Sequence, residues 1–83
     1  MEYNRLVWAS RRGMLELDLV LQPFLENHYA ALDAADKERF CNLLEEEDQD
    51  LFLWFMRRGD PEDPDLRHIV QVIRDHTGIQ PDA

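Results

Sequence analysis

Cysteine, glycine and long apolar runs are scarce in this sequence, and each shortage excludes a class of protein. Cys41 is the single cysteine, so an internal disulfide is impossible, which suits a reducing compartment. The three glycines, Gly13, Gly59 and Gly78, stand too far apart to form a phosphate-binding loop of the G-x-G-x-x-G or P-loop type. The sequence therefore predicts neither a Rossmann-type flavin enzyme nor a P-loop nucleotide enzyme.

Signals for membranes and for export are also missing. No segment approaches the ~20 consecutive apolar residues that a membrane span needs. The first ten residues, MEYNRLVWAS, contain neither the apolar run of a signal peptide nor the Arg/Ser-rich character of an organellar presequence. We therefore expect a cytoplasmic protein that does not insert into membranes.

Basic residues are outnumbered two to one. The 83 residues contain 18 acids against 9 lysines and arginines, for a formal net charge of −9. Residues 1–44 hold 7 acids and 5 bases, whereas residues 45–83 hold 11 acids and 4 bases, so we expect one strongly acidic face or end. Such a balance repels nucleic acids and anionic membranes, and it favours a neutral or basic protein partner.

Apolar residues recur three and four positions apart along most of the chain, and no alternating β-branched run interrupts them. This pattern predicts an all-α fold. The hydrophobic fraction of 45% is ordinary for a folded chain, and 83 residues suffice for a single small domain. We expect one domain, residues 1–83, folded as a compact bundle of about five short helices.

Caps and breakers divide the chain into these helices. We expect helix starts at four capping residues and helix ends at the three glycines. Pro64 suits the first position of the last helix, and Pro81 lies beyond its end. The expected caps are Asn4, Asp33, Asp48 and Asp63, and the expected ends are Gly13, Gly59 and Gly78.

The second helix, roughly residues 14–29, is the most informative. Pro23 removes one of its backbone hydrogen bonds and should bend it. At about 100° per residue, Glu16 falls on the side away from the core, together with Val20, Pro23 and Asn27. The predicted core stripe of this helix is Met14, Leu17, Leu21, Phe24, Leu25 and His28.

Residues suited to catalysis or metal binding do not form a recognisable group. The three histidines, His28, His68 and His76, do not stand four apart, and Cys41 has no second cysteine near it. We therefore expect no metal site and no catalytic residues, which argues against an enzyme. A small enzyme that pairs Cys41 with a histidine is the alternative, although a lone cysteine on an amphipathic helix is usually a buried hydrophobe.

The stretch RRGMLELD, residues 11–18, admits two compatible interpretations. In the first it only separates two helices: Gly13 takes the left-handed position, Arg11 and Arg12 neutralise the end of the first helix, and Glu16 reaches back to free amides. In the second it is a docking point, because a bare glycine backbone flanked by Arg12 and Glu16 admits close approach of a partner.

Two segments carry a family resemblance. WASRRGMLELDLVLQPFLENHY and LLEEEDQDLFLWFM together resemble the succinate dehydrogenase assembly factors, the bacterial and mitochondrial flavinators, whose signature is R-G-x-x-E. Here the signature is Arg12, Gly13 and Glu16 with Met14 and Leu15 between them, and a D-L-x-x-W pattern follows at residues 50–54. The resemblance covers roughly residues 5–73.

This resemblance implies a helical assembly factor that binds the flavoprotein subunit of succinate dehydrogenase, and of the related fumarate reductase. It implies that covalent attachment of FAD to a histidine of that client is promoted, with the FAD handled on the client and no cofactor held stably by this chain. The residues expected at the partner surface are Arg11, Arg12, Gly13, Glu16, Glu47 and Asp48. An antitoxin-like protein that neutralises a neighbouring toxin is the alternative.

Overall fold

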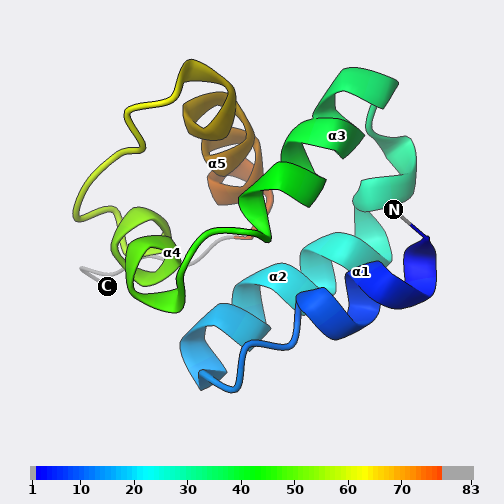
Figure 1. The fold of residues 1–83 in the computed structure, drawn as a ribbon, viewed down its shortest axis with the longest axis horizontal. Helices are drawn as coiled ribbons and strands as arrows, with labels where there is room; N and C mark the ends of the chain where they lie inside the picture. The colour runs from blue at the N-terminus through cyan, green and yellow to red at the C-terminus, as the bar shows by residue number, and fades with distance from the viewer. Residues whose placement is uncertain (1, 78–83) are drawn as a thin grey trace.

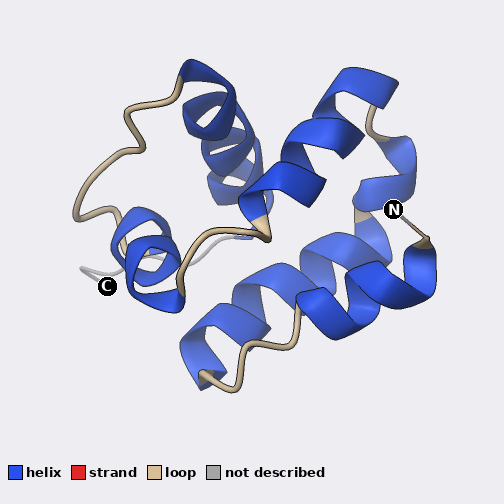
Figure 2. Ribbon diagram, viewed as in Figure 1, coloured by secondary structure: helices blue, strands red, loops and turns tan. Residues whose placement is uncertain are grey.

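The computed structural model describes residues 2–77, and within this range it contains five α-helices and one short 3-10 helix but no strand (Figures 1 and 2). The all-α expectation is therefore confirmed. None of the helices in this range is long and apolar enough to cross a membrane. The elements are α1 (Tyr3–Ala9), α2 (Leu15–Asn27), η1 (Tyr29–Ala31), α3 (Ala34–Leu43), α4 (Asp48–Phe55) and α5 (Pro64–Thr77).

Two of the four expected caps are confirmed. The Asp33 carboxylate accepts a hydrogen bond from the Asp36 amide (2.8 Å) at the start of α3. The Asp63 carboxylate likewise accepts one from the Asp65 amide (2.8 Å), and α5 begins at Pro64. Local sequence rules suffice here, because the cap and its amide are only two or three residues apart.

The other two expected caps are wrong. Asn4 lies inside α1, which begins one residue earlier after Glu2. Asp48 is the first residue of α4 rather than its cap, and Glu47 precedes that helix without a side-chain hydrogen bond to it. The carboxylate of Asp48 instead contacts an arginine far away in the sequence, as described below.

The end of α4 also differs from the expectation, because Gly59 is not its stop. Arg57 takes the left-handed conformation, with φ 59°. Its amide donates to the Trp54 carbonyl (3.2 Å), and the Arg58 amide donates to the Leu53 carbonyl (2.8 Å). This pair of bonds is the Schellman arrangement, in which glycine is the usual occupant of the position held by Arg57. Gly78 and Pro81, the expected end of α5, lie outside the described residues.

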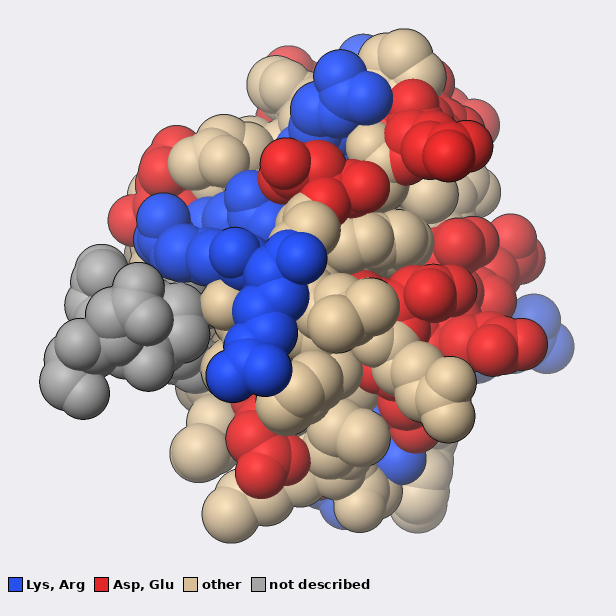
Figure 3. Space-filling view, turned by 90° about the vertical axis from the view of Figure 1, so that its left-hand side faces the viewer, with Lys and Arg blue, Asp and Glu red and all other residues tan. Residues whose placement is uncertain are grey.

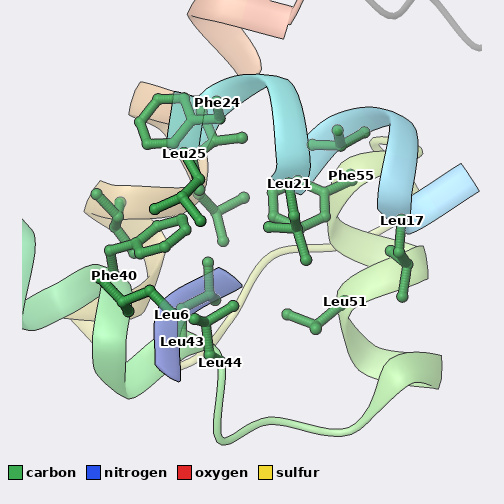
Figure 4. Close-up of a cluster of buried hydrophobic side chains, with 14 residues drawn as sticks. Leu6, Leu17, Leu21, Phe24, Leu25, Phe40, Leu43, Leu44, Leu51 and Phe55 are labelled. Carbon is green, nitrogen blue, oxygen red and sulfur yellow. The ribbon is translucent and has the colours of Figure 1, made fainter. Parts of the chain in front are cut away.

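A continuous hydrophobic core joins all five α-helices, and Figure 4 shows its side chains converging from separate helices. The buried apolar residues are Leu6, Leu17, Val20, Leu21, Phe24, Leu25, Phe40, Leu43, Leu44, Leu51, Phe55, Ile69, Val70 and Ile73. Phe24 and Phe40 stack at 5.6 Å between ring centroids, which ties α2 to α3.

The buried face of α2 is broader than the expected stripe. Val20, placed on the outer side by helical periodicity, is only 1% exposed. The reason is the central position of α2, which contacts α1, α4, α5 and η1 (Figure 1). A helix with neighbours on several sides buries more than one stripe.

We expect Arg57→Gly to stabilise the fold by about 1 kcal/mol, because a non-glycine residue in the left-handed region is strained. For a domain of this size the change corresponds to a rise of roughly 4–8 °C in Tm. The measurement is thermal unfolding followed by circular dichroism. Arg58→Gly is the matched control, and an equal rise in Tm for that variant would contradict the explanation.

Candidate functional site

The junction between α1 and α2 turns at Gly13, which takes the predicted left-handed conformation with φ +79°. The expectation that Gly13 ends the first helix is wrong, because α1 already ends at Ala9 with Ser10 as its cap. The residue is exposed, and a Cβ placed on it would meet no described atom within 4 Å. A larger residue is therefore disfavoured by backbone strain and not by a clash inside the chain. The peptide at Gly13 is open to an approaching molecule.

Arg12, directly before this glycine, points inward and holds the junction in place. Its side chain is 16% exposed. The guanidinium donates to the Asp48 carboxylate through Nε (2.7 Å) and to the Ala9 carbonyl through Nη1 (3.0 Å). It also donates to the carbonyls of Leu44 (2.8 Å) and Glu46 (2.7 Å). One side chain thus joins α1 to the connection between α3 and α4.

The Arg12 contacts make chemical sense at helix ends. Ala9 is the last residue of α1 and Leu44 follows the last residue of α3, so both carbonyls lie where a helix lacks donors. A cation is favoured at the C-terminal end of a helix. An anion is favoured at the N-terminal end, which is where Asp48 lies in the first turn of α4. The expectation that Arg12 neutralises the end of the first helix is confirmed.

Glu16 faces outward, as its predicted helical position requires, and it is exposed. No hydrogen bond or ion pair of its carboxylate occurs among the described residues, so the expected return to the backbone amides is wrong. Asp18 fills that role instead, because its carboxylate accepts a hydrogen bond from the Arg12 amide (3.0 Å). The Glu16 carboxylate therefore faces solvent beside the open backbone of Gly13.

The remaining expected contact residues fall into two groups. The Arg11 guanidinium lies over the Trp8 ring, 5.6 Å from its centroid, and Arg11 is exposed. Glu47 is exposed before α4, next to the Arg12–Asp48 pair. Asp48 is engaged by Arg12, with 36% of its side chain exposed. The structure thus brings Arg12 and Asp48 together and leaves Arg11, Gly13 and Glu16 on the surface.

Sequence reasoning missed the apolar surface beside this junction. Trp8 is 72% exposed, Leu15 is 68% exposed and Leu19 is 57% exposed. A signal was available for the two leucines, since they stand four apart on the side of the helix opposite the core stripe. The same periodicity places Trp8 on the side of α1 opposite the buried Leu6, two residues before it.

Two arginines of α5, Arg67 and Arg74, hold the loop that connects α4 to α5. Figure 3 shows basic side chains running together between acidic ones on the face in view, so that face is not uniformly acidic. Arg74 donates to the carbonyls of Trp54 and Gly59 and pairs with Asp60 (2.9 Å). Arg67 donates to the Pro61 carbonyl (3.1 Å). These contacts anchor the α4–α5 connection.

Cys41 and the histidines do not form a catalytic pair in the described part of the chain. The titratable neighbour of Cys41 is Tyr29, whose pKa is raised by burial and by the adjacent thiol. His28 stacks on His76 at 4.3 Å between ring centroids, and both rings lie against Phe24. Over residues 2–77 no three His, Cys, Asp or Glu residues are grouped as a metal site would require.

We expect Arg12→Lys to lower the free energy of unfolding by roughly 1–2 kcal/mol, because an ammonium group cannot serve four acceptors in a planar fork. Urea denaturation measures the change. Arg11→Lys is the control, since that guanidinium is exposed and we expect a change within about 0.5 kcal/mol. Equal destabilisation by the two variants would refute the assigned role of Arg12.

Known proteins are similar in sequence to this chain over most of its length. The family model described as "Flavinator of succinate dehydrogenase" matches residues 4–77. The FAD assembly factor SdhE of Pseudomonas aeruginosa is 59% identical over 81 residues, which cover 98% of this chain and 94% of that protein. The FAD assembly factor SdhE of Serratia sp. is 47% identical over 70 residues, covering 84% of this chain and 80% of that protein. The chain belongs to the family of flavinators of succinate dehydrogenase, which are FAD assembly factors.

Proposed function

We propose that this protein binds the flavoprotein subunit of succinate dehydrogenase, and of fumarate reductase, and promotes covalent attachment of FAD to a histidine of that subunit. The names of the family and of the relatives support the flavinylation role. The observation that carries the docking site is the exposed Glu16 carboxylate beside the open Gly13 backbone. Neither the names nor the structure favours a toxin as the partner.

The protein acts in this proposal by binding and not as an enzyme. The client and its flavin supply the reacting groups, and this chain holds no cofactor of its own. Its contribution is to stabilise a client conformation in which the histidine and the flavin are aligned, which lowers the entropic part of the barrier. A reducing compartment such as the cytoplasm suits its single free cysteine, Cys41.

The signature residues have different roles in the proposed docking. Arg12 and Asp48 fix the junction through their 2.7 Å ion pair, while Gly13 and Glu16 meet the client. Arg11 adds a surface cation, and Glu47 extends the acidic edge next to the junction. A carboxylate held on a rigid corner loses little entropy on binding.

We expect Glu16→Ala to leave Tm nearly unchanged and to lower covalent flavinylation at least tenfold at limiting concentration of the factor, because an exposed carboxylate contributes to docking and not to folding. Flavin fluorescence of the client in a denaturing gel measures the covalent product. Glu38→Ala, which removes an exposed carboxylate from α3, is the control. Normal flavinylation with Glu16→Ala would show that this carboxylate does not dock.

Two substitutions at Gly13 separate strain from obstruction. Gly13→Ala introduces only the strain of a side chain at φ +79°, about 1 kcal/mol, because nothing described surrounds the new Cβ. Gly13→Arg has the same strain and adds a long side chain at the docking surface. We expect similar Tm values for the two variants but much weaker client binding for Gly13→Arg, measured by calorimetric titration. Equal binding by both would place the contact elsewhere.

A further inference from the structure

An apolar surface adjoins the proposed docking corner on the outer side of α1 and α2. We call it the α1–α2 face and define it by Trp8, Arg11, Leu15, Leu19 and Gln22. Leu15, Leu19 and Gln22 stand four and three residues apart on α2, so they share one stripe of that helix. This stripe lies opposite the buried side that faces the core.

The α1 part of the face is connected to the α2 part through a shallow pocket. Arg11 and Gln22 both line this pocket, together with Tyr3 and Val7 of α1. Arg11 also covers the Trp8 ring at 5.6 Å. The exposed indole thus adjoins the pocket through Arg11, and the pocket adjoins the two exposed leucines through Gln22, which shares their stripe of α2. Glu16 stands on α2 beside Leu15.

We propose that the α1–α2 face binds an apolar patch of the flavoprotein subunit that is bordered by basic side chains. This inference rests on the proposed function and adds to it the chemistry of the contact. An apolar patch supplies the surface that Trp8, Leu15 and Leu19 can bury, and buried aromatic and aliphatic anchors carry most of the energy of an interface.

Charge identifies the partner as a basic surface and not as a second copy of this chain. Arg11 is the one charged member of the face, and its guanidinium lies over the Trp8 ring. The acids next to the face, Glu16 and Glu26, are exposed and outnumber it, and the chain has a net charge of −9. Two copies that met through this face would bring these acids together. A client with lysine or arginine around its apolar patch pairs with them and orients the complex.

The test measures binding of purified flavoprotein subunit, carrying noncovalent FAD, to the full chain and its variants by calorimetric titration. Leu15→Ser/Leu19→Ser and Trp8→Ala are each expected to weaken binding about tenfold or more, with Tm kept near the wild-type value because these side chains are exposed. Leu53→Ser is the matched control, since it removes a 45% exposed leucine from α4, and its Kd is expected to stay within about threefold.

The outcomes separate this inference from the proposed function. If the wild type binds and Glu16→Ala weakens binding, but either face variant binds within threefold of the wild type, the proposed function stands and the α1–α2 face is overturned. If the wild type does not bind the subunit at all, the proposed function is wrong. The proposal that this subunit covers the α1–α2 face is then wrong as well. Sedimentation of the wild type as a dimer that Leu15→Ser/Leu19→Ser dissociates, with client affinity unchanged, assigns the face to self-association and also overturns the proposal.

Discussion

The Arg12 guanidinium is the constraint on which the site depends. Its four hydrogen bonds connect the last residue of α1, the end of α3 and the first turn of α4. Two of the acceptors are carbonyls at helix ends, where no backbone donor remains to satisfy them. A single partly buried cation thereby replaces several separate caps, and it makes the orientation of three helices depend on one side chain.

This inward arginine explains how so small a domain presents a rigid surface. A chain of about 80 residues buries only about 60–65% of its unfolded surface, so surface junctions are normally its most mobile parts. At the α1–α2 junction the Arg12 amide is also held, by Asp18 at 3.0 Å, so backbone and side chain are both fixed. Gly13 and Glu16 extend from this fixed point, so the docking that we propose does not have to order them first.

The sequence predicted the features that depend on residues close together in the chain. Helical periodicity located all five α-helices, and Asp33 and Asp63 cap α3 and α5 as expected because each acts within a few residues. Gly13 has the expected left-handed conformation, although α1 ends before it at Ala9. The ion pair of Asp48 with Arg12 could not be predicted, since the two residues are 36 positions apart in the sequence. Val20 was misplaced for a related reason: its burial depends on how the other helices pack around α2, which contacts α1, α4 and α5.

The same limit applies to the signature itself, in which the arginine and the glutamate are four residues apart but face opposite ways. A motif read as letters suggests two charged contacts with a partner, whereas the fold assigns one to the interior and one to the solvent. The two sides of α2 follow the same division, because Leu17 and Leu21 pack inside while Leu15 and Leu19 remain outside. Scattered exposed leucines are normal in small proteins. Two on one stripe, together with the exposed Glu16 carboxylate and the exposed Trp8 indole, form the surface that we propose the flavoprotein subunit covers.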